Sequence, residues 1–155
     1  MNLIEILKAV PADAPMLTQI ALEAKRHWRY PESWIQFWKS SLSVSPDSII
    51  RNEVHKAVRA GEIIGFYTLE RVENRVALID MWVLPKYIGS GVGRHLFAHA
   101  VKLARSLGVV AMDIESDPNA EGFYVHMGAC RIGTIASEVE GHMRELPFLR
   151  LDLTH

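Results

Sequence analysis

Apolar residues recur along the chain with two periods, one typical of strands and one typical of helices. A helix is predicted after Asp13, with apolar residues at helical spacing as far as Trp28. A second, shorter helix is predicted by the spacing of Trp34, Trp38 and Leu42, and a loop or single turn follows at 45–48. The extended segments predicted in this half of the chain are 3–8, 54–59, 62–70 and 76–84.

The second half continues the alternation with a longer helix, which begins near Val92 and ends before Gly108. The later segments are a strand at 109–116, a short helix at 120–127, and strands at 131–137 and 144–153. A long helix between two strands implies a right-handed crossover, so the strands at 76–84 and 109–116 should be parallel. We therefore expect one α/β domain over residues 1–155, a mixed sheet of about seven mostly antiparallel strands flanked by about four helices.

Composition and charge exclude several classes of protein. Hydrophobic residues make up 49% and charged residues 23%, which is typical of a folded soluble protein, and the net charge of −1 without a basic cluster argues against nucleic-acid binding. The start lacks a signal-peptide pattern and no stretch approaches the roughly 20 apolar residues of a membrane span, so we expect a cytoplasmic protein that binds no membrane. Cys130 is the only cysteine, which excludes an intrachain disulfide, and we expect its thiol to be buried and inert.

The candidate binding motif lies between the strand that ends at Pro85 and the helix that opens at Val92. It reads Ile88-Gly89-Ser90-Gly91-Val92-Gly93-Arg94. Glycines let the backbone approach an anion closely, and the helix N-terminus adds the positive end of its dipole. This arrangement predicts binding of a phosphate or pyrophosphate.

Three alternatives to that interpretation are open to the same residues. A P-loop ends in Gly-Lys-Ser/Thr, but this loop ends Gly93-Arg94-His95. A dinucleotide fingerprint belongs in a βαβ unit with a Gly-x-x-Gly ending, whereas this loop follows an antiparallel meander and ends Gly-x-Gly. A glycine turn that only reverses the chain is the third alternative.

The loop resembles the motif of the GNAT family of N-acetyltransferases, Arg/Gln-x-x-Gly-x-Gly/Ala, with Ile88 where Arg or Gln is usual. Residues 117–129 resemble a second family segment, Asn-Ala…Tyr…Gly-Phe, which is matched by Asn119-Ala120 and Tyr124. The resemblance implies the GNAT acyl-CoA N-acyltransferase fold with acetyl-CoA as co-substrate and no metal. The cofactor-binding residues that it implies are Trp82, Val83, Ile88, Gly89, Ser90, Gly91, Val92, Gly93, Arg94, Asn119, Phe123 and Tyr124.

The resemblance also implies catalytic roles. Tyr124 matches the position of the family's general acid, and a backbone N–H near Trp82 or Val83 would hold the developing oxyanion. A packed aromatic with its hydroxyl on a carbonyl is the alternative for Tyr124. The residues themselves leave the base open: Glu70, Asp80, Asp113 or Glu115 could relay the proton, and we favour Asp80, Glu115 or a water molecule.

Other conspicuous residues are assigned less specific roles. His95 and His99 lie one helical turn apart, but without a third ligand they indicate a solvated helix face rather than a metal site. An acceptor site, core packing or a homodimer contact equally well explains the aromatic residues Trp28, Tyr30, Trp34 and Trp38. Asn119 is also expected to cap the helix that follows it.

These observations predict an N-acetyltransferase that moves an acetyl group from acetyl-CoA directly to the primary amine of a small or peptide acceptor. The alternative is a module of the same fold that binds CoA or acyl-CoA without catalysing transfer.

Overall fold

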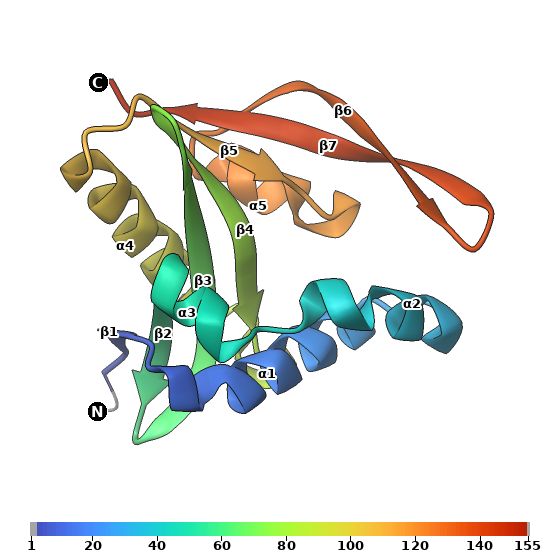
Figure 1. The fold of residues 1–155 in the computed structure, drawn as a ribbon, viewed down its shortest axis with the longest axis horizontal. Helices are drawn as coiled ribbons and strands as arrows, with labels where there is room; N and C mark the ends of the chain where they lie inside the picture. The colour runs from blue at the N-terminus through green and yellow to red at the C-terminus, as the bar shows by residue number, and fades with distance from the viewer. Residues whose placement is uncertain (1–2, 155) are drawn as a thin grey trace.

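The computed structural model describes residues 3–154, which form a seven-stranded sheet in the order β1-β2-β3-β4-β5-β7-β6 (Figure 1). The β4–β5 pair is parallel and the remaining neighbours are antiparallel, as the sequence predicted. The strands are β1 Glu5–Lys8, β2 Glu53–Arg59, β3 Glu62–Val72, β4 Arg75–Val83, β5 Ala111–Glu115, β6 Cys130–Val139 and β7 His142–Asp152.

Five α-helices accompany the sheet: α1 Ala14–His27, α2 Glu32–Leu42, α3 Pro46–Arg51, α4 Val92–Ser106 and α5 Glu121–His126. The sequence predicted four of them and assigned a loop or single turn to the start of α3. Helix α3 forms because the Ser45 hydroxyl accepts a hydrogen bond from the Ser48 N–H, and Pro46 occupies its first turn, where no backbone donor is needed.

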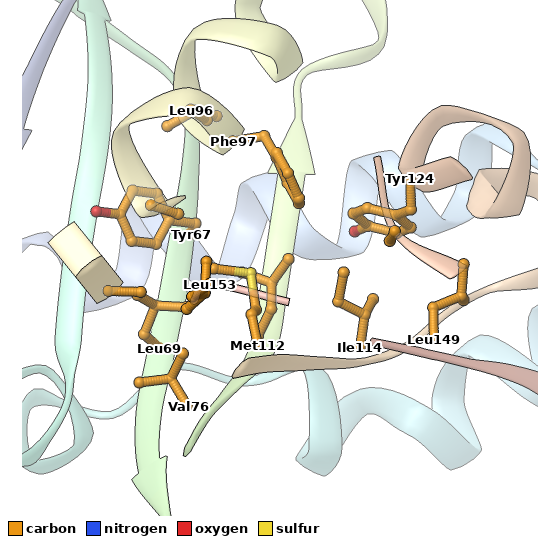
Figure 2. Close-up of a cluster of buried hydrophobic side chains, with 14 of the residues drawn as sticks. Tyr67, Leu69, Val76, Leu96, Phe97, Met112, Ile114, Tyr124, Leu149 and Leu153 are labelled. Carbon is orange, nitrogen blue, oxygen red and sulfur yellow. The ribbon is translucent and has the colours of Figure 1, made fainter. Parts of the chain in front are cut away.

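Two hydrophobic cores cover the two faces of the sheet. On one face, α4 and α5 pack on β3, β4, β5 and β7, and Figure 2 shows Phe97 and Tyr124 close to the strand residues Met112 and Ile114. On the other face, Leu17 and Ile20 of α1 pack with Phe66 of β3. The sheet is therefore fixed from both sides, while its β4–β5 junction lies between the two layers.

The parallel pairing of β4 with β5 covers only the first part of β4. It runs from Arg75 opposite Ala111 to Leu78 opposite Ile114, although β4 continues to Val83. The register of β4 against β3 also shifts at this point, because Ile79 is an extra residue between the partners of Leu69 and Thr68. Beyond this bulge, β4 and β5 separate and leave space between them.

Cys130 corrects one expectation from the sequence. Its side chain is exposed, whereas the preceding residue, Ala129, is buried in the core beneath α5. Cys130 begins β6, which is an edge strand with mostly exposed residues, so its side chain has no layer of helices to cover it. The prediction of a buried thiol was wrong.

No helix within residues 3–154 is long and apolar enough to cross a membrane.

The close approach of β3, β4 and α4 at Gly65 leads to a stability prediction. A Cβ at Gly65 would lie 2.8 Å from the Trp82 carbonyl oxygen and 3.1 Å from the Leu96 side chain. We expect Gly65→Ala to lower the free energy of unfolding by about 1–3 kcal/mol, measured by urea denaturation.

The matched control is Gly133→Ala in β6, because a Cβ at Gly133 would meet no atom within 4 Å. We expect that variant to change the free energy of unfolding by about 0.5 kcal/mol or less. Equal stability of the two variants would contradict the close approach at Gly65.

Candidate active site

The space between the separated ends of β4 and β5 is a cleft of about 420 Å³. Helix α1 borders it from one side of the sheet, and the N-terminal end of α4 and helix α5 border it from the other. Of the residues predicted to bind or act, those that line the cleft are Trp82, Val83, Ile88, Gly89, Gly91, Gly93, Arg94, Glu115, Asn119, Phe123 and Tyr124. Ser90, Val92 and Asp80 do not line it.

The loop before α4 presents backbone N–H groups to the cleft. Gly89 and Gly91 adopt φ values of 85° and 90°, in the left-handed region that favours glycine. No side chain caps α4, and the N–H groups of its first residues have no carbonyl partner inside the helix. This is the geometry of an anion-binding helix N-terminus.

The other two residues of this loop have local structural roles. The Ser90 hydroxyl and its N–H both donate to the Tyr87 carbonyl oxygen, which holds the turn closed. Val92 is buried in the core, so its side chain anchors the first turn of α4. Only the backbone of these two residues is placed to contribute to the loop.

The absence of side chains at Gly91 and Gly93 keeps the cleft open at this end. A Cβ on Gly93 would lie 3.5 Å from the Phe123 ring, and one on Gly91 would lie 3.9 Å from the His95 ring. Arg94 is exposed beside them and adds a positive charge. The loop therefore combines free donors, positive charge and space, and it fits a pyrophosphate.

Tyr124 extends from α5 to the point where β4 and β5 separate. Its ring is buried against Phe123 and Phe97, with ring centroids 5.3 and 5.9 Å away. Within residues 3–154 its hydroxyl has no hydrogen-bond partner, so it is not held on a carbonyl as the alternative interpretation required. Burial, together with the charges of Asp117 and Asp80, raises the pKa of this hydroxyl, which stays protonated at neutral pH.

The two candidate bases differ in their surroundings. Asp80 is half-buried on β4, where its carboxylate accepts from the Trp82 indole N–H at 3.4 Å. Burial raises the pKa of Asp80, and the neighbouring donors of Thr68 and Trp82 oppose that effect only in part. Glu115 ends β5 with an exposed side chain that borders the cleft.

The β3–β4 register distinguishes the two candidate oxyanion donors. The Leu84 N–H donates to the Ile64 carbonyl oxygen of β3. Because N–H directions alternate along an antiparallel strand, the Trp82 N–H also faces β3, and the Val83 N–H faces the separated side of β4. Val83 is therefore the residue whose backbone donor points toward the cleft.

A polar cluster that the sequence did not predict closes the other end of the cleft. The Lys25 ammonium of α1 lies 2.6 Å from Asp117, which follows β5, and both side chains are buried. The Tyr30 hydroxyl donates to Asp117 at 3.1 Å, and the Asn119 amide donates to Tyr30 at 3.1 Å. Arg144 of β7 also donates to the Tyr30 hydroxyl, at 3.0 Å.

The electrostatics of this cluster follow from its burial. Burial lowers the pKa of Lys25, and the neighbouring Asp117 carboxylate limits that decrease. Burial also raises the pKa of Asp117, but the Lys25 ammonium, together with the hydrogen bonds from the Asn119 N–H and the Tyr30 hydroxyl, outweighs it, and the resulting pKa lies below the usual range. The two groups therefore stabilise each other as an ion pair that ties α1 to the end of β5.

The cluster changes the role predicted for Asn119. The side chain that caps this turn is that of Asp117, which accepts from the Asn119 N–H at 2.9 Å, and α5 itself begins without a side-chain cap. The prediction of an Asn119 cap was wrong because an Asp two residues earlier makes that bond. One signal for the cluster was present in the sequence, since Lys25 lies on the otherwise apolar face of α1 with Ala21 and Ala24.

One of the two histidines of α4, His99, also differs from the prediction of a solvated helix face. His95 is exposed, but His99 is half-buried, and its Nδ1 lies 2.7 Å from the Tyr67 hydroxyl. The His99 ring also lies 5.0 Å from that of His55. His99 therefore belongs to a packed cluster between α4 and the sheet, and no metal-binding group of three or more ligands exists within residues 3–154.

Comparison with protein families identifies the group to which these features belong. The model of the Acetyltransferase (GNAT) family matches residues 14–129. The chain belongs to the GNAT family of acetyltransferases. The resemblance of the two sequence motifs is confirmed, and the protein is an acyltransferase. A search of curated proteins gives no significant match.

Solved structures of this family share the fold. An N-acetyltransferase from Thermoplasma acidophilum in complex with coenzyme A, named PaiA, has a TM-score of 0.75 at 21% identity, over 97% of this chain and 99% of that one. The ribosomal-protein-S18-alanine N-acetyltransferase of Escherichia coli has a TM-score of 0.74 at 19% identity, over 99% and 96%. An IAA acetyltransferase from Bacillus cereus has a TM-score of 0.71 at 18% identity, over 97% and 100%. They confirm the predicted mixed α/β fold.

The loop of residues 88–94, which we call the anion loop, leads to a prediction about coenzyme A binding. Gly91→Glu should weaken coenzyme A binding at least roughly tenfold, because its side chain would enter the loop with a negative charge. Isothermal titration would measure this change, and the increase in melting temperature with acetyl-CoA should decrease in parallel.

The control for strain and charge is Gly141→Glu in the β6–β7 turn. Gly141 has a φ of 81°, close to that of Gly91, and lies outside the cleft. We expect Gly141→Glu to bind coenzyme A like the wild type. Wild-type binding by Gly91→Glu would place the anion site elsewhere.

Proposed function

We propose that this GNAT protein transfers the acetyl group of acetyl-CoA directly to the primary amine of a small acceptor. The observation that carries the proposal is the continuity of the cleft, which joins the anion loop before α4 to the Tyr124 hydroxyl at the strand separation. A cofactor held by its pyrophosphate at the loop has an open path to that hydroxyl. Coenzyme A bound to the Thermoplasma relative supports the choice of cofactor.

The loop residues would hold the cofactor mainly through their backbone. The N–H groups at the start of α4 would bind the pyrophosphate, with Arg94 adding charge, and Phe123 and Asn119 border the path between β4 and β5. Acetyl-CoA supplies a thioester, in which the acetyl carbon is electrophilic and the thiolate is a good leaving group. Ile88 replaces the usual Arg or Gln without removing any of these backbone donors.

Val83 supports the developing negative charge on the acetyl oxygen. Its N–H faces the separated side of β4, where no β5 carbonyl is in register to accept it. A fixed backbone donor needs no reorganisation during the reaction, so it stabilises the transition state more effectively than solvent water.

Tyr124 and Asp80 divide the proton transfers between them. The raised pKa of the Tyr124 hydroxyl keeps it protonated, so it can donate a proton to the departing thiolate. The raised pKa of Asp80 makes its carboxylate a better proton acceptor for an incoming ammonium, directly or through water. Glu115, which is exposed at the cleft, would attract that ammonium by its charge.

The rival function, a module that binds CoA without catalysis, has less support. Such a module needs the anion loop. It does not need a buried tyrosine whose free hydroxyl lies where the strands separate and is affected by the charges of two carboxylates. Family membership supports acetyl transfer in general.

The acid role leads to a test of catalysis. Tyr124→Phe keeps the packed ring and removes the proton donor, so kcat should fall by roughly tenfold to a thousandfold with little change in coenzyme A affinity. Release of free thiol, with an acceptor found by screening amines, measures the rate.

Tyr67→Phe is the matched control, since it removes a buried hydroxyl from the core that contacts His99 instead of the cleft. Its kcat should stay within about twofold of wild type, because this hydroxyl lies outside the cleft and acts independently of the reaction. If Tyr124→Phe also keeps wild-type kcat, the acid is another group.

The base role leads to a pH prediction. Burial raises the pKa of Asp80, so the rate should fall as the pH decreases through that raised value and the carboxylate becomes protonated. Asp80→Asn should lower kcat by roughly tenfold to a thousandfold and remove this acidic limb from the pH–rate profile. Glu115→Gln, the same change at an exposed carboxylate, should affect mainly KM. The opposite pattern would assign the base to Glu115.

A further inference from the structure

Two segments that are distant in sequence lie beyond the Asp117–Asn119 end of the cleft, next to the residues that line it. Figure 1 shows α2 and the β6–β7 hairpin extending in the same direction, beyond the ends of β4 and β5. Their side chains bridge the space between them, since Ser33 donates to Glu140 at 3.0 Å and the Trp34 ring lies 5.5 Å from His142. An acceptor that approaches the acetyl group from this end meets the side chains of both segments.

Arg144 is the charged group at the centre of this end. Its guanidinium carbon lies 5.1 Å from the centroids of the Tyr30 and Trp38 rings and 5.7 Å from that of Trp34. One nitrogen donates to the Tyr30 hydroxyl, and through that hydroxyl Arg144 connects to Asn119 at the cleft. Its half-buried side chain is thus fixed in position beside the cleft.

The guanidinium lacks a carboxylate partner. Within residues 3–154 no Asp or Glu lies at ion-pair distance from Arg144, and the nearby Asp117 is paired with Lys25. A guanidinium has five N–H donors in a planar fork, and here one nitrogen is engaged with Tyr30. The remaining donors match the geometry of a carboxylate, which they can bind in a bidentate manner.

The aromatic rings at this end are already occupied by the protein's own cations. The Lys25 ammonium lies 4.3 Å from the Trp38 ring centroid and 4.9 Å from that of Tyr30, and Arg144 lies over the same two rings. A ligand cation would therefore find these faces filled and would be repelled by two positive charges. This arrangement disfavours polyamines.

Negative charge, opposite in sign to that of Arg144, lies on the sheet side of the cleft. Glu115 borders the cleft from β5, whereas Asp80 lies on β4 behind the lining residues, near enough for its charge to act on the Tyr124 hydroxyl. An ammonium is attracted to these carboxylates, and an anionic group is attracted to Arg144. Negative charge therefore lies on the sheet side of the cleft, and the positive charge of Arg144 lies in the adjoining region between α2 and β7.

We infer that the acceptor is a zwitterionic small molecule, an amino acid or a similar amine that carries a carboxylate, and that Arg144 binds this carboxylate. The inference rests on the proposed function, because it names the acceptor class of the same reaction. Arg144 is then a specificity-determining residue, which orients the acceptor with its amine toward Asp80 and Tyr124.

The first experiment compares acceptors that differ only in the carboxylate. Amino acids, including ω-amino acids of several lengths, are each tested beside the corresponding carboxamide, with spermidine as a polycation. The acids should have a kcat/KM roughly tenfold to a hundredfold above that of their amides, as expected for a charge-assisted bidentate contact, and spermidine should be poor.

The second experiment removes the guanidinium. Arg144→Met should abolish the preference for the acid by raising its KM, leave the amide unchanged, and keep the acetyl-CoA melting shift, while Arg144→Lys should restore part of the preference. The control is Arg71→Met at the exposed end of β3, where the guanidinium lies 3.5 Å from the Glu73 carbonyl oxygen. That variant should keep the full preference.

The outcomes separate this inference from the proposed function. Three results would overturn the inference and leave acetyl transfer intact. They are acetylation without a preference for acids, a preference for spermidine, and an equal loss of kcat/KM for acid and amide in Arg144→Met. If no amine is acetylated, titration of the same acids into the protein with coenzyme A tests whether the carboxylate site exists. Binding that depends on Arg144 supports the carboxylate site while the proposed function fails, and the absence of binding overturns both.

Discussion

The early end of the β4–β5 pairing is the constraint on which the site depends. These two strands stay in register for four residue pairs, and then the bulge at Ile79 turns β4 while β5 ends at Glu115. Each polar group that we assign to the reaction lies at or beyond this point. A continuous parallel pair would fill the cleft with backbone hydrogen bonds and would cover the Val83 N–H.

The separated strands need to be held apart, and the buried ion pair between Lys25 and Asp117 contributes to this. It ties α1, on one face of the sheet, to the chain immediately after β5. Removing one partner would leave the other charged and buried, which is far costlier than the loss of an exposed ion pair. The same pair positions the Tyr30 hydroxyl, so the support of the cleft and Arg144 belong to one connected network.

The reaction that we propose uses different physical means at the two ends of the cleft. At the α4 end, the anion would be bound mainly by backbone donors beside glycines, with charge added by Arg94, so the identity of Ile88 matters little. Beyond the other end, the acceptor recognition that we infer depends on side chains, because Tyr30, Trp38 of α2 and Arg144 of β7 come together there. The cofactor end is thus set by backbone conformation, and acceptor choice is set by side chains that differ between proteins of one fold.

The sequence by itself determined the order of the strands and helices, the parallel step, the glycine loop and the position of Tyr124, because each depends on local periodicity or on short motifs. It did not determine that Cys130 is exposed, that His99 is packed against Tyr67, or that α3 is a helix. Nor did it indicate that Lys25 pairs with Asp117, 92 residues later, or that Arg144 lies beside Tyr30. Contacts between distant residues depend on how α1, α2 and the β6–β7 hairpin pack against the sheet, and only the tertiary structure decides that packing.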